Sequence, residues 1–408
     1  MANTLKFGNG EWYGKEGTIL AYNSENNNYK PLPFDFSRAS SATRVNKQGL
    51  IETVGADQPR VDYLNDSNGA LLLEPSRTNS VPYSNDFNQH SILGGSITSD
   101  NITSPDGGVN SDTFVEDTAN SQHRIREDIS VTDGTYTMSV FIKGTDRFIS
   151  LYPQSAGIAY AVFDIENAAI TKTGGSDYVD SKIENYGNGW YRCILTYNVS
   201  TGTSFLHIYL SDKGTGTAAE APTYTGDGSE MSFYGLQAEQ GGYATSIIKT
   251  QGSSVTRVAE QGIDGGAGTP IFSNTSAVWF IDLERIGVDT DSSGSAMALR
   301  NSSFSQQIRL HFDAPTTNIR FRDALNGFAT ISTITGMSAG VRKKIALRID
   351  GSALSTFANG SKIGSDYTAP STFDIDEIDF STLGFKIHDM RFYNEALTDQ
   401  ELINLTKI

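Results

Sequence analysis

Histidine is the first residue to consider, because it serves both acid–base catalysis and metal binding at neutral pH. The chain has five, scattered along its length: His90, His123, His207, His311 and His388. The sequence contains no HExxH, no GxSxG, no Walker loop and no Cys/His pair at metal-ligating spacing. We therefore predict no catalytic residues and expect that the protein is not an enzyme.

Paired carboxylates are the other route to an enzyme, because a glycosidase needs two of them about 5 to 10 Å apart across a cleft. The densest acidic stretches are "EDTANSQHRIREDI" and "DIDEIDF". We interpret both as solvated strand edges or loops. Sequence alone does not show whether two carboxylates face each other, so glycan depolymerisation stays open as a third hypothesis.

Oxygen ligands for a metal are concentrated in "GVDTDSSGSA", residues 287–296. Asp289 and Asp291 loosely match the start of an oxygen-rich calcium loop. The bidentate Glu that closes an EF-hand loop is missing, and Arg300 stands near its position. A polar hairpin loop is the alternative interpretation. Structural calcium held by Asp289 and Asp291 is the one cofactor that we consider.

Aromatic side chains would recognise a sugar, since they stack on the apolar C–H face of a pyranose while polar groups orient its hydroxyls. In "SFLHIYLSD", the period-2 alternation of a strand places Leu206, Ile208 and Leu210 in the core. The opposite face and a neighbouring strand, "RFISLY", supply the predicted glycan-binding residues of a first module: Tyr152, Phe205, His207 and Tyr209.

A second polar row is predicted further along the chain, where charged residues alternate along two adjacent strands. Its members are Arg309, His311, Arg320 and Arg322. They suit either an acidic glycan or a contact with another subunit. A second subunit could equally cover the aromatic row.

Two other reactive or aromatic side chains are expected in the core. Cys193 is the only cysteine, so no intrachain disulfide can form, and no His lies near it in sequence to activate it. Trp190 follows the tight turn in "GNGWYR". We predict that Cys193 is a buried structural thiol and that Trp190 fills the core.

A short motif occurs twice, as "SRASSATRV" at residues 37–45 and "GSSVTRVAE" at 252–260. An Arg among hydroxyl side chains suggests an anion site, but a phosphate-cradling Gly loop followed by a helix is absent. We interpret the copies as boundary markers on either side of a module. Arg44 and Arg257 are expected to tie linker backbone to a carboxylate or carbonyl, and to form a clasp if the copies pair in space.

The composition fits two or three β-rich domains. Of 408 residues only 19% are charged, while Gly, Tyr and Phe number 40, 18 and 21. Gly tolerates tight turns and the aromatic residues suit a pleated sheet. The net charge of −16 argues against binding to nucleic acid or to an anionic membrane.

The amino-terminal stretch "MANTLKFGNG" has no apolar run of signal-peptide length. No segment approaches the roughly 18 to 20 apolar residues that cross a bilayer. We expect synthesis in a cytoplasm without a recognisable export signal, and no membrane insertion.

Strand-like segments dominate from about residue 83, among them "GTYTMSVFIKG" and "GWYRCILTYNV". Asn-Gly pairs at 188–189, 326–327 and 359–360 predict hairpins, because both residues tolerate positive φ. Regularly spaced strands of this kind indicate antiparallel β-sandwiches. A Gly-rich break at 260–270 separates two such sets.

The two ends of the chain differ from this pattern. The first 80 residues or so are irregular, with short apolar pieces split by Gly, Asn and Pro. They are poorly suited to a core of their own. The chain ends in one short helix, where Thr398 and Glu401 of "ALTDQELINL" form a capping box and Leu402 and Leu405 share a face that should dock on the second sandwich.

Several stretches resemble a group of bacteriophage virion proteins of the tail-fibre, head-fibre and adhesin type. They are "FDFSRASSATRVNKQGLIETVGADQPRVDY", "ALLLEPSRTNSVPYSNDF", "GNGWYR" and "LQAEQGGYATSIIKTQGSSVTRVAE", so the resemblance covers about residues 30 to 262. The sandwich of those proteins is similar to carbohydrate-binding modules. "IDGSALSTFANGSKIG" and "HDMRFYNEALTDQEL" resemble a concanavalin A-like, laminin-G-like lectin domain.

The lectin-like fold also hosts glycanases, whose strands carry a Glu-x-Asp-x-x-Glu pattern. "FIDLER", residues 280–285, has Asp282 and Glu284 but lacks the third carboxylate. The resemblance thus does not extend to that catalytic pattern.

The resemblance implies an all-β protein of jelly-roll or lectin-like sandwiches in three parts. Residues 1–82 form an attachment or oligomerisation segment, 83–262 a carbohydrate-binding-module-like sandwich, and 263–408 a concanavalin A-like sandwich with the short helix. The implied function is a virion fibre or adhesin that binds host surface polysaccharide. The alternative is a structural capsid decoration or fibre protein that contacts other virion proteins, and a homotrimer is expected in either case.

Overall fold

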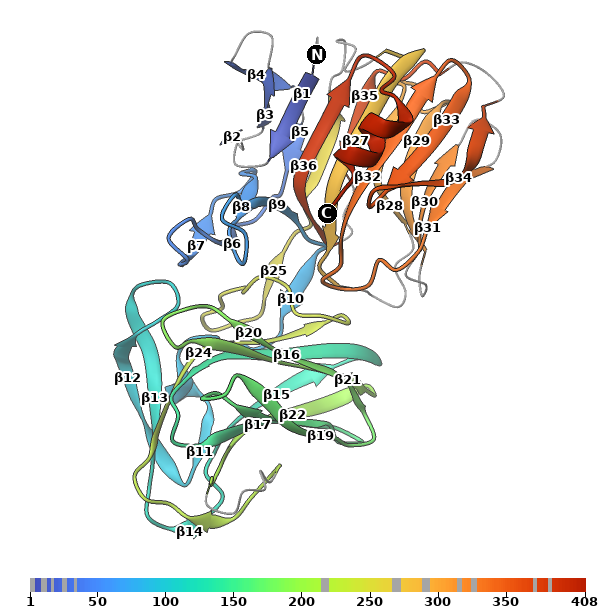
Figure 1. The fold of residues 1–408 in the computed structure, drawn as a ribbon. Coiled ribbons are helices and arrows are strands. Elements are labelled where there is room, and N and C mark those ends of the chain that lie inside the picture. Colours follow the sequence, from blue (N-terminus) through green and yellow to red (C-terminus); the bar gives the residue numbers. More distant parts are fainter. Residues whose placement is uncertain are drawn as a thin grey trace. The chain divides into compact units, whose positions relative to one another are not determined.

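The computed structural model describes residues 4–8, 13–15, 18–23, 28–32, 35–213, 220–265, 273–287, 294–313, 318–323, 329–369, 373–380 and 384–408. The chain forms two compact units. The terminal unit comprises residues 1–47, 53–76 and 258–408, and the middle unit comprises residues 48–52 and 77–257. Described regular structure is almost entirely β-strand, which confirms the predicted all-β class (Figure 1).

The middle unit contains two six-stranded antiparallel sheets. One has the order β12 (Gly95–Thr103), β13 (Val109–Glu116), β24 (Glu230–Gln240), β16 (Gly134–Lys143), β21 (Tyr191–Val199) and β20 (Tyr178–Asn185). The other, called here the β22 sheet, has the order β11 (Ser91–Leu93), β15 (Arg124–Val131), β22 (Gly202–Ser211), β17 (Phe148–Gln154), β18 (Tyr160–Asp164) and β19 (Ala169–Gly174). The short pairs β10 (Arg77–Asn79) with β25 (Val255–Arg257) and β14 (Asn120–Ser121) with β23 (Tyr224–Thr225), and the 3₁₀ helix η1 (Phe87–Gln89), complete the unit.

A single hydrophobic core joins the two sheets of the middle unit. Met138 and Phe233 from one sheet and Leu151 and Ile208 from the other are fully buried in it. Cys193 is also buried in this core, as predicted. Trp190 is 1% exposed, and its indole Nε1–H donates to the carbonyl oxygen of Thr103 at 3.0 Å, so the predicted core position of this side chain is confirmed too.

Two of the three predicted Asn-Gly hairpins lie in described residues. Asn188 and Gly189 both have positive φ, 52° and 79°, between β20 and β21. Asn359 and Gly360 do the same, at 48° and 79°, between β33 (Ala353–Ala358) and β34 (Ser361–Thr368). These are the paired positive angles that Asn-Gly supplies to a tight hairpin. The third pair, at 326–327, lies outside the described residues.

The terminal unit is also built from two antiparallel sheets. The larger runs β2 (Tyr13–Lys15), β3 (Thr18–Asn23), β1 (Thr4–Gly8), β36 (Phe385–Tyr393), β27 (Ser276–Arg285), β32 (Arg342–Asp350), β33 and β34, and is joined by β4 (Asn28–Leu32), β8 (Arg60–Asp62) and β9 (Ala70–Leu73). The smaller runs β31 (Ala329–Ile334), β30 (Asn318–Asp323), β29 (Gln307–Asp313), β28 (Gly294–Arg300), β35 (Glu377–Phe380), β26 (Gln261–Gly265) and β5 (Asp35–Ser37). Between β5 and β8 the chain also forms β6 (Ala42–Val45) and β7 (Ile51–Val54).

The amino-terminal residues belong to this unit and do not stand apart as a segment of 1–82. Strands β1 and β9 both pair with β36 near the end of the chain, and β5 pairs with β26. Short strands without a core of their own are thereby completed by the sheets of the carboxyl-terminal sandwich. The last stretch of the terminal unit, which includes β26, begins at residue 258, whereas the expected boundary was residue 263.

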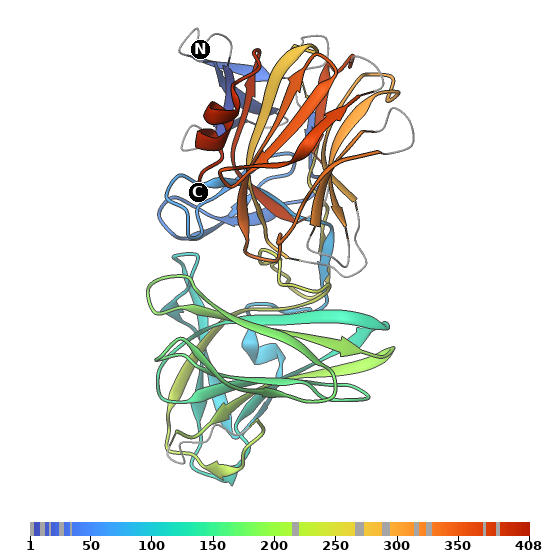
Figure 2. The same ribbon diagram turned by 45° about the vertical axis from the view of Figure 1, so that its right-hand side comes forward.

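The single α-helix of the described residues, α1 (Asp399–Leu405), is capped as predicted. The Thr398 side chain accepts from the Glu401 backbone N–H, and the Glu401 side chain accepts from the Thr398 N–H. Leu402 is buried in a small cluster with Val278 and Phe280 of β27. The helix therefore docks on the outer face of the larger sheet (Figure 2).

Candidate functional site

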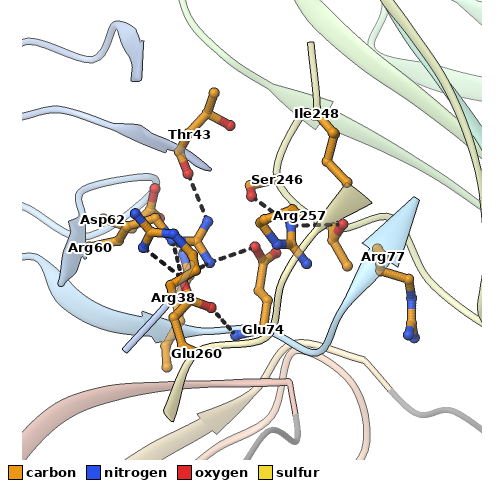
Figure 3. A network of polar contacts seen from close by, with 12 residues as sticks. Arg38, Thr43, Arg60, Asp62, Glu74, Arg77, Ser246, Ile248, Arg257 and Glu260 are labelled. Carbon is orange, nitrogen blue, oxygen red and sulfur yellow. Dashed lines mark hydrogen bonds and ion pairs between the residues drawn. The ribbon is translucent and has the colours of Figure 1, made fainter. Parts of the chain in front are cut away.

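The two copies of the repeated motif meet in the terminal unit. The backbone N–H of Val258 donates to the hydroxyl of Ser40 at 3.0 Å. Beside this contact, Arg38 Nη1 lies 3.1 Å from Oε1 of Glu260 (Figure 3). A clasp was expected if the two copies of the motif pair in space. These two contacts connect the two copies.

The residues proposed for the clasp take different places. Arg44 is half-buried in β6. Arg257 in β25 is 1% exposed and donates to the hydroxyls of Thr245 and Ser246, at 3.1 and 3.0 Å, within the middle unit (Figure 3). The ion pair between the copies joins Arg38, the second residue of the first copy, to Glu260, the last residue of the second.

Glu260 is the centre of a buried network. Its Oε1 also accepts from Arg60 at 2.6 Å, and its Oε2 accepts from the Glu74 backbone N–H at 2.9 Å. Arg60 pairs in turn with the Glu74 carboxylate at 2.9 Å. Burial alone would lower the pKa of Arg60, but the two carboxylates outweigh it and raise that pKa. Because Arg60, Glu74 and Glu260 are buried and paired with one another, they stabilise the fold and are not accessible to a ligand.

The predicted aromatic row lies on the outer face of the β22 sheet. Leu206, Ile208 and Leu210 are fully buried in the core, as the alternation predicted. The intervening side chains therefore point to the opposite face of the sheet. Phe205 is half-buried there, while His207 and Tyr209 are each only 6% exposed.

Strand pairing places further aromatic rings beside this row. Tyr152 of β17 is directly opposite His207. Its ring centroid lies 6.1 Å from that of His207, 5.8 Å from Tyr209 and 6.3 Å from Tyr160 of β18, to which it is parallel within 9°. We call Tyr152, Tyr160, Phe205, His207 and Tyr209 the aromatic face. All four residues predicted for the first module lie within it.

Charged groups border the aromatic face on both sides. The guanidinium of Arg126 lies over the Phe205 ring, 4.4 Å from its centroid, and binds both oxygens of Asp128 at 2.6 Å. On the other side, Lys172 lies 5.5 Å from the Tyr160 centroid and pairs with Glu220. The face thus combines rings with both donors and acceptors for hydroxyl groups.

Protonation states on the face follow from burial. Burial and the nearby Arg124, whose Nη1 lies 3.2 Å from His207 Nδ1, lower the pKa of His207 to about 4. Burial raises the pKa of Tyr152 and of Tyr209. At neutral pH the imidazole is therefore uncharged and the phenols keep their protons, so each can donate and accept hydrogen bonds.

Sequence reasoning missed Tyr160 and the two arginines Arg124 and Arg126. The arginines alternate with the buried Ile125 in "HRIRED", which is a strand signal, but the stretch was interpreted as a solvated acidic patch. Their place beside β22 depends on long-range pairing, in which Arg126 is opposite His207. The alternation of buried and exposed residues within one strand does not indicate which strand pairs with it.

The second predicted row is brought together by strand register in the terminal unit. Arg309 is opposite Arg322, and His311 is opposite Arg320, on β29 and β30. Arg309, His311 and Arg320 are half-buried, and Arg309 donates to Gln307 at 2.6 Å. The Arg322 side chain lies outside what the structure describes.

Asp282 of "FIDLER" lines a charged pocket of about 300 Å³ in the terminal unit, and His388, which contacts Glu284, lines it as well. Arg342 binds both oxygens of Asp282, at 2.7 and 2.8 Å, and His388 Nε2 lies 3.0 Å from Glu284. Burial would raise the pKa of Glu284, but His388 and Lys386 outweigh it and lower that pKa. A general acid for glycoside hydrolysis requires the opposite shift.

The predicted calcium ligands Asp289 and Asp291 lie outside the described residues. Within the described ranges, no group of three or more His, Cys, Asp or Glu side chains is arranged to hold a metal ion. None of the helices in those ranges has the length and hydrophobicity of a membrane span.

Comparison with known proteins gives only remote similarities. No protein-family model matches the chain, and no curated protein matches its sequence. Among solved structures, Trypanosoma rangeli sialidase aligns over 95% of this chain at 12% identity and a TM-score of 0.29. Laminin domains LG4-5 of the mouse α1 chain align over 74% of this chain and 89% of their own length, at 9% identity and a TM-score of 0.23. The chain spans 65% of the length of the sialidase.

Proposed function

We propose that the protein is a non-enzymatic virion adhesin that binds host cell-surface glycans through the aromatic face of its middle unit. The observation that carries this proposal is the convergence of Tyr152, Tyr160 and Phe205 beside the Arg126–Asp128 pair. Rings of this kind stack on the C–H face of a sugar, and a guanidinium–carboxylate pair orients its hydroxyls.

The burial of the central residues supports a rigid platform. His207 and Tyr209 are fixed between their neighbours, with ring centroids 5.2 Å apart. Tyr152, Tyr160 and Phe205 are more exposed and present their rings at the surface. A platform that is already ordered loses little conformational entropy when it binds.

The viral context of the proposal comes from the sequence resemblance to phage fibre and adhesin proteins. In that context the protein is part of a virion and forms a homo-oligomer, most simply a trimer. Weak single-site affinity for a sugar then increases through effective concentration when several copies engage one cell surface. The lowered pKa of Asp66 in the charged pocket, and that of Glu284 beside it, do not suit a general acid for glycan cleavage.

The test is retention of the purified oligomer on host surface polysaccharide. Phe205→Ala removes a half-buried ring that an Arg covers at 4.4 Å. Its matched control is Phe304→Ala in the terminal unit, where Arg300 covers an exposed ring at 3.9 Å. We expect Phe205→Ala to weaken binding about tenfold per site, as loss of a stacking ring does, and Phe304→Ala to leave it unchanged.

Three other results would contradict the proposal. Absence of binding by the wild-type oligomer, together with tight binding to other virion proteins, would favour the structural alternative. Equal losses in the two variants would place the site elsewhere. New reducing ends on incubation with host capsule would indicate a depolymerase.

A further inference from the structure

A polar pocket of about 600 Å³ opens in the middle unit and shares no residue with the aromatic face. Its walls come from the region of η1, from β12 and β13, and from the segment before β25. They consist of five amide side chains, three carboxylates, two hydroxyls, one Lys and one Tyr. The volume falls within the range of about 300 to 1,000 Å³ that is typical of small-molecule sites.

The walls of this pocket are held by buried hydrogen bonds. Asp112 is 2% exposed, and its two oxygens accept from the backbone N–H groups of Phe87, at 2.8 Å, and Asp100, at 3.0 Å. Ser84 and Thr250 exchange hydrogen bonds between the N–H of each and the hydroxyl of the other, both at 2.9 Å. The side chains of Asp112 and Thr250 and the backbone of Asp100 are therefore set in position before a ligand arrives.

Two lining residues, Asp100 and Asn110, have features that are common at binding sites. Asp100 has φ of 51° within β12, where the pairing register shifts between Thr98 and Ile102. Such bulges re-aim side chains and often lie beside functional sites. The Oδ1 atom of Asn110 is buried and has no hydrogen-bond partner among the described residues, so an acceptor is left over at the wall.

The excess of carboxylates in the pocket indicates which class of ligand it can bind. Asp86, Asp100 and Asp112 face a single cation, Lys249, whose ammonium group is already paired with Asp106 at 2.8 Å. Excess negative charge disfavours acidic sugars and phosphates. In the described part of the chain these carboxylates also do not form a metal-binding group. Amide and carboxylate oxygens that are densely placed around a preformed cavity suit the hydroxyl groups of an uncharged sugar.

We propose that this pocket binds a neutral hexose unit, held by hydrogen bonds from its hydroxyls to Asp86, Asp100 and the amide side chains, with Tyr83 as the aromatic wall. The site is separate from the aromatic face and rests on the proposed function only for the source of the sugar. The middle unit then has two glycan subsites of different charge preference.

The experiment is titration of the full-length protein with methyl glycosides of glucose, galactose, mannose, N-acetylglucosamine and glucuronic acid, by calorimetry and saturation-transfer NMR. Asp100→Asn removes a charge and keeps a residue type that tolerates positive φ. Asn88→Ala removes an exposed amide of the pocket. Asp180→Asn, at an exposed position on β20, is the matched control for loss of a carboxylate.

We expect at least one neutral glycoside to bind the wild type, and to bind Phe205→Ala, in which the aromatic face is impaired, more tightly than the glucuronide does. Each pocket variant should weaken that binding about tenfold, while Asp180→Asn and Phe205→Ala leave it unchanged. The proposal is overturned if no neutral glycoside binds, if the pocket variants bind as the wild type does, or if Phe205→Ala alone removes binding. Retention on polysaccharide that is lost in Phe205→Ala but kept in Asp100→Asn would support the aromatic face while rejecting the pocket.

Discussion

Replacement of Glu260 by Gln is the sharpest test of how the repeated motif holds the terminal unit together. Glu260 is fully buried and accepts from Arg38, Arg60 and the backbone of Glu74. Glu260→Gln keeps the shape of the side chain but removes its charge. Arg38 and Arg60 both lose the carboxylate that they share, while the pair between Arg60 and Glu74 remains.

The expected cost follows from burial. Removal of one partner from a buried ion pair costs about 3–5 kcal/mol, because it leaves charge that neither water nor a counter-ion compensates. In the native structure the side-chain exposures of Arg38 and Arg60 are both 0%, so solvent screens little of the positive charge that Glu260→Gln leaves uncompensated. A loss of about 3–5 kcal/mol is a large fraction of the stability of a typical domain.

The measurement is equilibrium unfolding in urea, followed by the fluorescence of Trp279 in the terminal unit and of Trp190 in the middle unit. The third tryptophan, Trp12, is replaced by Phe throughout, and Trp190 or Trp279 is replaced by Phe in turn to separate the signals. Glu166→Gln is the control, since Glu166 is 59% exposed and pairs with Lys213 at the surface. That change should cost under about 1 kcal/mol. A loss below about 1 kcal/mol for Glu260→Gln would refute the view that this network stabilises the terminal unit.

Further predictions concern pH, capping and calcium. Burial lowers the pKa of His207 from 6.5 to about 4, so the unfolded chain takes up a proton before the folded one and stability should fall as pH drops from about 6.5 towards 4. His207→Gln should flatten that fall in denaturant midpoints measured across this range. Thr398→Ala should cost about 1 kcal/mol in thermal unfolding, because it removes the N-cap of α1. If Asp289 and Asp291 bind calcium, its addition should raise the melting temperature of the wild type and not of the Asp289→Asn variant, whereas no heat in calorimetric titration would exclude the site.

Local features of the fold were predictable because they depend on neighbours in sequence. The alternation around Leu206 and Ile208, the positive φ at Asn188 and the capping box at Thr398 each involve a few consecutive residues. The pairing of β9 with β36 joins opposite ends of the chain, and the short apolar run "ALLL" contains no signal for its partner. For that reason the amino-terminal residues looked like a separate segment.

The candidate site was predictable to the same extent. One strand supplies Phe205, His207 and Tyr209. The register of β18 and β15 with their neighbours adds Tyr160 to the aromatic face and places Arg126 at its border. The polar pocket had no sequence signal, because its walls come from three separated stretches in which Asn and Asp are common turn residues. The shape of such a cavity depends on the tertiary arrangement of its loops, which the local sequence does not specify.

The two proposed subsites of the middle unit differ in charge, and this difference bears on which glycan would be held best. Arg124, Arg126 and Lys172 border the aromatic face, where Arg126 pairs with Asp128 and Lys172 with Glu220. The polar pocket instead has excess carboxylate. A polysaccharide that alternates acidic and neutral units can satisfy both subsites at once, and binding at the second becomes intramolecular after the first, which raises affinity through effective concentration. A neutral homopolymer can use the pocket but brings no further anion to the cationic border. The protein should therefore discriminate among host polysaccharides by the pattern of charge along the chain more than by any single sugar.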